Sequence, residues 1–512
     1  MPGPPPAEGC RSARFWSTFF WIGSLQHRKV EKRLSGRLRH FLGLALAVTG
    51  AACLAASASA TPMRPALSSV PFVQISDAAA HAAQVTRICP VPTGPVFCYT
   101  PSLIQQAYDF PNGRNATGAG QTIVLVEAYG SPTLAADLAA FDAEYKIPDP
   151  PSLTVLNQQV PVPGSGGSGD TFFWAVETSL DVEYAHAMAP GANIVVAVAD
   201  TDDSQNLLQV EQEVLPNYRS AIVSQSFGAD ETGPCSDPAS FAAMESLYAD
   251  QVQHGGTVVA SSGDYGATNL GPLDEHCPST APMAGFPASS PLVLAVGGTQ
   301  GNPYPGGLWI APGKYGGEQV WNEVTPTISP GAGATGGAPS VVFSAPPWQQ
   351  GLTTYSTRTE PDVSYNAAVN GGVIIILGGR HGVIGGTSAG APQWAAIVAL
   401  ANELRGKQGR LPLGRATPQL YAIAQDSRSY GEDFHDILTG NNALGAGLPG
   451  FPTLPGFSAG TGYDIPTGLG TPDVANLLKD LSVHESPHLR VDDLAHSANG
   501  NRGGHVVLDP RG

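Results

Sequence analysis

Short runs of β-branched and aliphatic residues alternate along the chain with longer segments of helical periodicity. Six runs are nearly continuous in apolar character and are predicted strands, at 122–127, 193–199, 221–226, 257–262, 292–296 and 373–377. Four segments have the apolar spacing of helices, at 133–145, 177–187, 205–215 and 239–254. Strands without polar alternation are typical of a parallel sheet that is covered on both faces. The pattern predicts an α/β fold, a doubly wound domain with a mostly parallel central sheet flanked by helices.

Three regions depart from this alternation. Residues 300–350 are rich in Gly, Pro and Ser, so we expect long surface loops or hairpins there. Residues 427–472 combine Asp, Asn and Gly with few apolar positions, and something other than a hydrophobic core must hold them. The last residues, 485–512, are polar and aperiodic and are predicted to be a disordered tail.

The N-terminus differs in character from the rest of the chain. A basic run from Arg28 to His40 is followed by the apolar stretch FLGLALAVTGAACLAASASA, which ends at Ala60. This order is typical of a secretory signal peptide cleaved after Ala60, so we interpret 1–60 as a leader and expect a secreted protein. A membrane anchor is the alternative, but the strongly apolar part is shorter than the ~20 residues that span a bilayer. We therefore expect no membrane association once the leader is removed.

Export makes the cysteine count informative. Four cysteines lie outside the leader, Cys89, Cys98, Cys235 and Cys277. An even number in an oxidising compartment favours disulfides over free thiols. Three pairings are possible, and sequence separation favours Cys89–Cys98 with Cys235–Cys277.

Charge limits the possible partners. The 512 residues include 25 Lys and Arg against 42 Asp and Glu, for a formal net charge of -17. Because eight of the basic residues and only two of the acidic ones lie in 1–60, the remainder is more acidic still. Such a chain is not a basic nucleic-acid binder. Only 13% of residues are charged, so the folded protein has few ion pairs to lose in acid.

The clearest candidate for catalysis is a serine in GGTSAGAPQWAAIVALAN (385–402). A Gly-rich turn places Ser388 directly before a helix predicted to start at about Ala389. There the helix dipole and free backbone N–H groups can stabilise an oxyanion. The alternative is an ordinary serine cap on a helix. Glycines on both sides and Pro392 in the first turn are more than a cap requires.

A serine nucleophile needs a base, which is usually a histidine held by an aspartate. The segment where a subtilisin-type enzyme would place its aspartate reads VEAYG (126–130). No His-Gly-Thr-His motif follows, and we interpret His254 and His381 as incidental. A subtilisin-type Ser-His-Asp hydrolase that uses an unrecognised histidine stays open as an alternative.

Carboxylates can supply the base instead. Glu177 and Asp181 are four residues apart on a predicted helix, so both project from one face. Adjacent carboxylates disfavour double ionisation, which lets one of them act as a base in acid. The alternative is a solvated acidic stripe that includes Glu183. A third carboxyl group, Asp264 in TVVASSGDYGA, follows a predicted strand at the end where open α/β sheets place functional groups, although a turn-forming Asp would also fit there.

Five motifs in matching order resemble the sedolisins, the serine-carboxyl peptidases with a subtilisin-like fold. They are ETSLDVEYAHAMAPGA, SSGDYGA, FPASSPLVLAVGGT, PDVS and GGTSAGAP, and the resemblance covers about residues 98–484. It implies that Ser388 is the nucleophile, Glu177 the general base, Asp181 its orienting partner and Asp264 the oxyanion-hole group. A carboxyl group that donates to an oxyanion must be protonated. The resemblance therefore implies a peptidase domain at 99–484, a monomer that cleaves proteins or peptides in acid as an endopeptidase through an acyl-enzyme.

A second part of the resemblance concerns a metal. FHDILTGNN and SAGTGYDIPTGLGTPD are similar to the calcium loop of the family, here at 432–473. The similarity implies one structural calcium ion, bound by the carboxylates of Asp436 and Asp464 and the backbone carbonyls of Ile437, Gly460 and Gly462. Hard oxygen ligands suit calcium. The alternative is a turn rich in Asp, Asn and Gly that binds no metal.

The chain departs from the family in two places. Family members usually carry a long pro-segment, whereas only residues 61–98 separate the predicted leader from the peptidase domain, so the pro-domain is truncated or absent. The Gly-rich segment near the substrate cleft reads GGAPSVVFS (336–344), with several small residues replaced. These departures motivate the alternative of a catalytically inert binding protein on the same scaffold. We expect the strand end at 226–228 to line the cleft.

Overall fold

The computed structural model describes residues 63–65, 72–86, 88–91, 94–111, 116–157, 169–268, 281–301, 315–324, 332–444 and 454–483. The predicted leader and the predicted tail lie outside these ranges, and the predicted domain boundaries stay predictions. Within these ranges no helix is both long enough and apolar enough to cross a bilayer.

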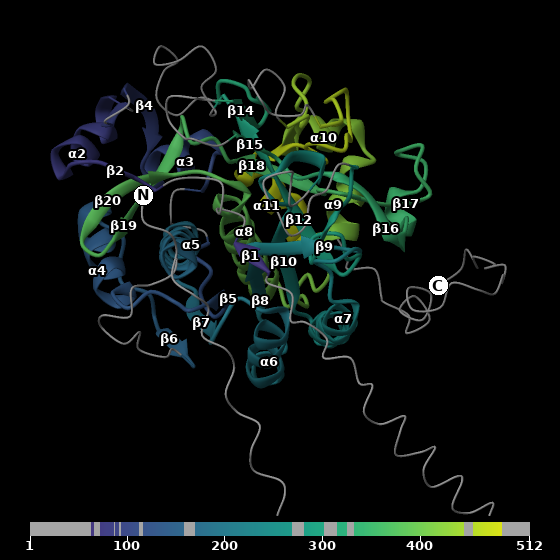
Figure 1. Ribbon diagram of the computed structural model, residues 1–512, viewed down its shortest axis with the longest axis horizontal. Coiled ribbons are helices and arrows are strands. Elements are labelled where there is room, and N and C mark those ends of the chain that lie inside the picture. Colours follow the sequence, from purple (N-terminus) through teal and green to yellow (C-terminus); the bar gives the residue numbers. More distant parts are fainter. Residues whose placement is uncertain are drawn as a thin grey trace, which may run out of the picture. The chain divides into compact units, whose positions relative to one another are not determined.

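An eight-stranded sheet forms the centre of the fold (Figure 1). Its order is β13-β12-β10-β8-β5-β7-β6, with β18 paired to β12. The strands are β5 (Thr122–Ala128), β6 (Leu153–Leu156), β7 (Asn193–Ala199), β8 (Ile222–Gln225), β10 (Thr257–Ser261), β12 (Val293–Gln300), β13 (Gln319–Val320) and β18 (Val363–Asn366). Every pairing is parallel except that of β13 with β12. The mostly parallel central sheet is thus confirmed.

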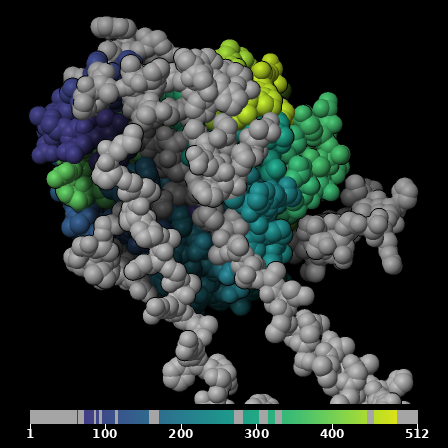
Figure 2. Space-filling view, in the orientation of Figure 1, coloured from purple at the N-terminus to yellow at the C-terminus, as the bar shows by residue number. Residues whose placement is uncertain are grey.

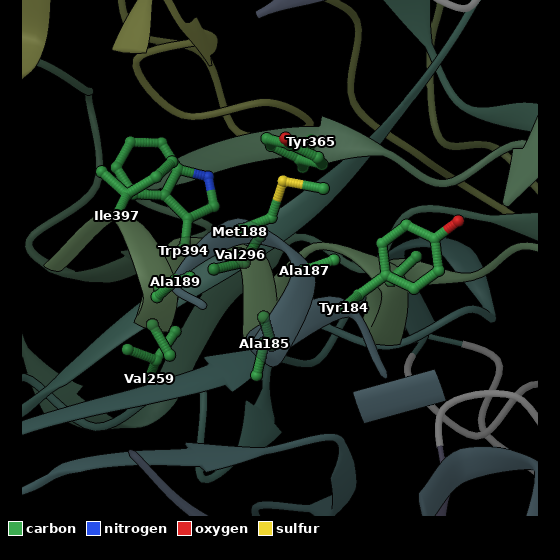
Figure 3. Packing of buried hydrophobic residues seen from close by; sticks show 14 of the residues in the cluster. Tyr184, Ala185, Ala187, Met188, Ala189, Val259, Val296, Tyr365, Trp394 and Ile397 are labelled. Carbon is green, nitrogen blue, oxygen red and sulfur yellow. The ribbon is translucent and has the colours of Figure 1, made fainter. Parts of the chain in front are cut away.

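Helices cover both faces of this sheet. On one face α5 (Gly169–Met188) and α8 (Ala391–Lys407) lie together, with α4 (Leu134–Tyr145) and α11 (Val474–Val483) packed outside them. The other face carries α6 (Ser204–Val214) and α7 (Pro238–Gln253). Because side chains alternate along a strand, Leu125 packs in the α5 and α8 cluster while its neighbour Val126 packs with α6 and α7. Figure 3 shows the first cluster, where Met188 of α5 lies near Trp394 of α8.

A second, five-stranded sheet has the order β2-β20-β19-β4-β3. Its strands are β2 (Val73–Gln74), β3 (Ile88–Val91), β4 (Gly94–Tyr99), β19 (Gly372–Leu377) and β20 (Arg380–Ile384). The assignment of 373–377 to the parallel central sheet is therefore wrong. Gly378 and Gly379, with φ of 59° and 69°, form a tight turn that returns the chain antiparallel to β19. The run is continuously apolar because this sheet too is covered on both faces, with Ile374 and Ile375 in different clusters.

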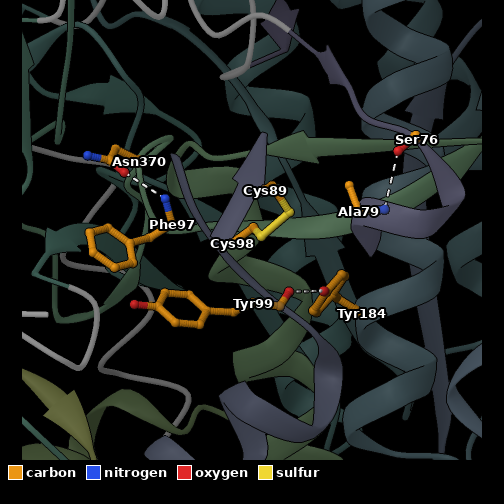
Figure 4. The surroundings of a disulfide bond; sticks show 8 residues. All are labelled: Ser76, Ala79, Cys89, Phe97, Cys98, Tyr99, Tyr184 and Asn370. Atoms are coloured by element: carbon orange, nitrogen blue, oxygen red, sulfur yellow. Dashed lines mark hydrogen bonds between the residues drawn. A yellow bond between two sulfur atoms is a disulfide. The ribbon is translucent and has the colours of Figure 1, made fainter. Parts of the chain in front are cut away.

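A disulfide joins Cys89 of β3 to Cys98 of β4, as predicted (Figure 4). Beside it, the backbone N–H of Phe97 donates to Asn370 Oδ1 at 2.9 Å. Cys235 is disulfide-bonded as well. Its predicted partner, Cys277, lies outside the described residues. The helix α2 (Asp77–Thr86) packs on this edge of the second sheet, and α3 (Pro101–Ala107) leads from it to the central sheet.

Smaller elements complete the fold. A three-stranded sheet has the order β1-β9-β11, formed by β1 (Arg64–Pro65), β9 (Phe227–Asp230) and β11 (Gly285–Phe286). The expected hairpins in 300–350 are present, as β14 (Asn322–Val324) with β15 (Ala332–Ala334) and β16 (Ala338–Ser344) with β17 (Thr357–Glu360). The described residues between 417 and 472 include α9 (Thr417–Ala424), α10 (Ser427–Asp433), β21 (Phe434–His435) and β22 (Thr471–Pro472), the last two paired.

Candidate active site

Ser388 lies in a single 3-10 turn, Thr387–Ala389, that leads directly into α8. Its side chain is fully buried. The glycines on either side are required by the geometry: Gly386 has a φ of 110°, and a Cβ on Gly390 would come within 2.8 Å of Val296. The predicted serine at a helix start is therefore present, with an approach that only glycine permits.

Asp264 contacts the residue directly before the serine. It follows β10 and Gly263, whose φ is 101°. Asp264 Oδ1 accepts hydrogen bonds from the backbone N–H and the hydroxyl of Thr387, each at 2.8 Å. Within the described part of the chain, neither Asp264 Oδ2 nor Ser388 Oγ has a hydrogen-bond partner, although both are buried. Both atoms therefore keep hydrogen-bonding capacity that the described residues do not use.

Burial makes Asp264 a weak acid. It raises the pKa of this carboxyl to about 7, even though the two hydrogen bonds from Thr387 lower it. In acid the group is therefore neutral and carries a proton. A neutral carboxyl can donate a hydrogen bond, which a carboxylate cannot.

The two carboxyl groups predicted to share a helix face lie on α5, which packs against the turn that holds Ser388. Glu177, Asp181 and Glu183 are all fully buried, so the interpretation as a solvated acidic stripe is wrong. Glu183 belongs to a different environment, because its carboxylate accepts from the backbone N–H of Ile376 in β19 at 3.0 Å. Glu177 and Asp181 lie on the same helix, which contacts the Ser388 turn.

Asp181 is held from the central sheet. Its Oδ2 accepts a hydrogen bond from the hydroxyl of Ser226 at 2.7 Å, at the carboxyl end of β8. Burial raises the pKa of Asp181 to about 8, although its hydrogen bonds with Ser226 and Glu127 lower it. Asp181 is therefore also neutral in acid.

Glu127 is a further buried carboxyl that the sequence analysis did not assign. It lies in β5, fully buried, and Thr178 Oγ1 donates to it at 3.4 Å. Burial and then the charges of Asp181 and Glu177 raise its pKa well above the ordinary value for a glutamate. The available signal was a glutamate inside VEAYG, an acidic residue in an otherwise apolar strand of a sheet covered on both faces.

The Gly-rich segment that departs from the family lies against the Asp264 loop. Gly336 donates its backbone N–H to Gly263 O at 2.6 Å, and a Cβ on Gly336 would collide with the carbonyl oxygen of Ser262. Further along, the Glu231 carboxylate accepts from the hydroxyl of Ser340 and the backbone N–H of Val341, both at 2.6 Å. The replaced residues are thus anchored. In the β16–β17 hairpin that they begin, Val341 and Val342 are exposed, whereas Arg358, Thr359 and Glu360 are buried. Part of this region is visible in green at the right of Figure 2.

The two histidines considered as bases lie elsewhere. His381 in β20 contacts Asp77 through Nδ1 at 3.0 Å. His254 follows α7 and bonds the backbone carbonyl of Asp250. Because Ser388 Oγ has no hydrogen-bond partner in the described ranges, no described histidine is bonded to it.

The predicted calcium ligands come together in one region. Asp436 accepts hydrogen bonds from the Tyr430 hydroxyl at 3.1 Å and from the backbone N–H of Gly462 at 2.9 Å. Asp464 accepts from the backbone N–H of Gly460 at 2.9 Å. Burial raises the pKa of Asp464 to about 6, and the charge of Asp436 contributes.

This donor set suits a calcium ion. Two acidic side chains lie close together without an ion pair to Lys or Arg among the described residues. Asp464 Oδ1 also accepts from the backbone N–H and the hydroxyl of Thr467, at 2.9 and 2.8 Å. The lone pairs left on the two carboxylates, with the carbonyls of Ile437, Gly460 and Gly462, would be the hard donors that calcium takes. No three His, Cys, Asp or Glu side chains in the described ranges gather as a metal-binding group. A site built from two carboxylates and backbone carbonyls does not need a third side chain of these types.

Comparison with known proteins gives three matches of note. The model of the subtilase family matches residues 173–418. Kumamolisin from Bacillus sp. (strain MN-32) is 36% identical over 355 residues, which cover 68% of this chain and 58% of that protein. Sedolisin from Pseudomonas sp. (strain 101) is 30% identical over 390 residues, 74% of this chain and 60% of that protein. The chain thus spans somewhat less than two thirds of the length of these curated relatives.

A solved structure is also similar. Pseudomonas sedolisin, a serine-carboxyl proteinase complexed with two molecules of pseudo-iodotyrostatin, superimposes with a TM-score of 0.62 at 26% sequence identity. The match covers 75% of this chain and 98% of that one.

Proposed function

The chain belongs to the sedolisin family, and from this membership we propose that it is a serine-carboxyl endopeptidase that hydrolyses peptide bonds in acid. The observation that supports the proposal is the contact of Asp264, a buried carboxyl, with Thr387, the residue directly before Ser388. Next to it α5 supplies two further buried carboxyl groups, Glu177 and Asp181.

In the proposed reaction the oxygen of Ser388 attacks the carbonyl carbon of the scissile peptide bond. Glu177 accepts the hydroxyl proton as this bond forms and then delivers it to the leaving amine. The C–N bond breaks and an acyl-enzyme remains on the serine. Water then attacks the ester with Glu177 again as the base, which releases the acid product and restores the serine hydroxyl. Asp181 orients Glu177 along the same helix face.

Asp264 stabilises the tetrahedral intermediate in this scheme. Its Oδ1 accepts hydrogen bonds from Thr387. Oδ2 is therefore the oxygen that carries the proton and donates a hydrogen bond to the oxyanion. Because the pKa of Asp264 is about 7, this proton is present in acid and lost as the pH rises through neutrality. The alkaline limit of activity follows from this group.

The proposed setting is outside the cell. A secreted monomer that acts on protein or peptide substrates agrees with the predicted leader at 1–60 and with the disulfide between Cys89 and Cys98. A calcium ion held by Asp436, Ile437, Gly460, Gly462 and Asp464 would neutralise the two adjacent carboxylates and order the loop around them.

Hydrolysis of a denatured protein between about pH 3 and 6 tests the function, with fragments identified by mass spectrometry. Internal cleavage should be lost in Ser388→Ala while the melting temperature is retained. No cleavage by the parent under these conditions, with calcium present, would refute the proposal. Treatment with an aldehyde-bearing peptide inhibitor separates an enzyme from an inert binding protein, because only the former gives a covalent adduct on Ser388.

A further inference from the structure

A buried serine lies at the carboxyl end of the central sheet, close to the candidate site. Ser261 is the last residue of β10, and its side chain is 3% exposed. Its Oγ has no hydrogen-bond partner within the described part of the chain. The large majority of buried polar side-chain atoms in folded proteins have a partner, so the place of this hydroxyl in the fold calls for an explanation.

Ser261 belongs to the face of the sheet that α5 and α8 cover. Side chains alternate along a strand, and Val259, two residues earlier in β10, packs in the α5 and α8 cluster. Val296 of β12, the register partner of Ser261, packs there as well, and Figure 3 labels both valines. β10 also contacts the 3-10 turn that contains Ser388. The hydroxyl of Ser261 is therefore on the side of the sheet that carries the candidate catalytic residues.

The neighbour of Ser261 in the adjacent strand is Ser226. Ala260 of β10 and Gln225 of β8 are register partners, so the next residue of each strand also comes side by side. Ser226 faces α5 too, because its hydroxyl donates to Asp181 of that helix at 2.7 Å. Paired strands are about 4.8 Å apart, which brings two serine side chains on the same face within hydrogen-bond reach of each other.

The two hydroxyls have complementary hydrogen-bonding capacity. Ser226 gives its single proton to Asp181 Oδ2, while its oxygen lone pairs can accept. Ser261 has a proton for which the described residues offer no acceptor in the present rotamer. Rotation of the Ser261 side chain about χ1, between staggered positions, directs this proton toward Ser226 Oγ.

We propose that Ser261 is a positioning residue of the candidate site, which donates to Ser226 and so fixes the hydroxyl that holds Asp181. The inference rests on the proposed peptidase function, in which Asp181 orients Glu177. Hydrogen bonds that form a chain polarise and strengthen one another. The chain from Ser261 through Ser226 to Asp181 connects β10 and β8 to α5, and it restrains the partner of the general base from the side of the sheet.

The loss of this bond should affect proton transfer more than substrate binding, because Ser261 acts through Asp181 and Glu177. Ser261→Ala should lower kcat about three- to tenfold, which is the range that one hydrogen bond supplies, and leave KM within about twofold of the parent. Ser261→Thr keeps the hydroxyl and should restore kcat. A loss of kcat in Ser261→Thr as large as in Ser261→Ala would contradict the proposed role of the hydroxyl.

Ser224 provides the matched control. It lies two residues before Ser226 in the same chain segment, is fully buried, and its Oγ likewise has no partner in the described ranges. Its register partners, Leu125 in β5 and Val259 in β10, are apolar. Ser224→Ala should therefore leave kcat close to that of the parent. A loss as large as that of Ser261→Ala would show that kcat responds to packing in this cluster, and it would overturn the proposal.

A double-mutant cycle on kcat tests whether Ser261 acts through Ser226. The variants are Ser261→Ala, Ser226→Ala and the two together, assayed in acid with a fluorogenic peptide. If the bond exists, Ser261→Ala should have little further effect once Ser226 is replaced. An equal loss in both backgrounds would refute the chain.

The pH profile gives a readout that needs no change at Ser226, which matters if Ser226→Ala does not fold. The hydrogen bond from Ser226 lowers the pKa of Asp181, so weakening it should raise that pKa further. Asp264→Asn removes the other carboxyl expected to ionise near neutrality. In that background Ser261→Ala should shift the alkaline decline of kcat upward by up to about half a pH unit. A decline that stays in place or moves downward would contradict the proposal.

A measurement without catalysis separates this inference from the proposed function. The same cycle on the free energy of unfolding, obtained by urea denaturation, should show coupling between Ser261→Ala and Ser226→Ala. Coupling in a chain that hydrolyses no peptide would refute the peptidase function alone. Hydrolysis by the parent without coupling in either cycle would refute only the role of Ser261.

Discussion

Replacing Asp264 tests the alkaline limit of activity that the proposed mechanism predicts. Asp264→Asn keeps an oxygen that can accept from Thr387 and places an N–H donor where the carboxyl proton would be. An amide does not ionise. The variant should therefore keep much of the activity in acid and lose the decline near neutrality.

The size of the effect follows from the burial of Asp264. A pKa of about 7 instead of 3.8 corresponds to a preference of about 4 kcal/mol for the neutral form, relative to an exposed carboxyl. At about pH 4 nearly all molecules carry the proton, and at about pH 8 only about a tenth do. Asp264→Ala removes the donor altogether, which at an oxyanion hole lowers kcat by about 10²- to 10³-fold.

The assay is kcat measured with a fluorogenic peptide between about pH 3 and 9 for the parent, Asp264→Asn and Asp264→Ala. The parent should decline as the pH rises through about 7, since a carboxyl with a raised pKa is neutral below that value and charged above it. In Asp264→Asn the decline should move toward about pH 8, where Asp181 ionises. A decline that stays near 7 in the Asn variant, or an Ala variant within threefold of the parent, would refute the assignment.

Three further outcomes are expected. Thr387→Val removes the hydroxyl bond that lowers the pKa of Asp264, so the alkaline decline should shift upward by about one pH unit in the same assay. Chelation of calcium should lower the melting temperature of the parent but not that of Asp464→Ala, and an equal loss in both would argue against the metal site. Burial raises the pKa of Glu211 to about 8, so this carboxyl favours the folded state in acid and that advantage is lost as the pH rises through about 8. Calorimetry should show a smaller drop in melting temperature between about pH 5 and 8 for Glu211→Gln, and an unchanged drop would contradict this reasoning.

Local sequence patterns predicted the elements of the central sheet well, because strands buried on both faces leave a strong apolar signal. Strand 193–199 has the predicted bounds, and the helix predicted at 239–254 is observed as Pro238–Gln253. The same signal could not assign 373–377 to a sheet. Burial on two faces is common to the central sheet and the second one, and the difference lies in a turn of two glycines at 378 and 379.

Sequence alone pointed to those site residues that stand in an unusual local pattern. Ser388 is flanked by glycines before a helix, and Glu177 and Asp181 are two carboxyl groups spaced four residues apart on a helix. Glu127 was missed because a single glutamate in a strand has no partner within its own segment, and its neighbours come from α5 in the folded chain. Whether a carboxyl is buried also depends on packing, which is why a solvated stripe was a reasonable alternative for α5.

The second sheet has a practical consequence for anyone who wants to produce the protein. β2 pairs with β20, the strand that runs directly into the turn before Ser388, and β4 lies along β19. An expression boundary drawn at residue 99, where the predicted peptidase domain begins, would delete β2 and all of β4 except Tyr99, and Cys89 and Cys98 with them. The strands that lead to Ser388, the proposed nucleophile, would lose their neighbours on two sides. A shortened protein intended to be the minimal catalytic unit should begin before Phe72.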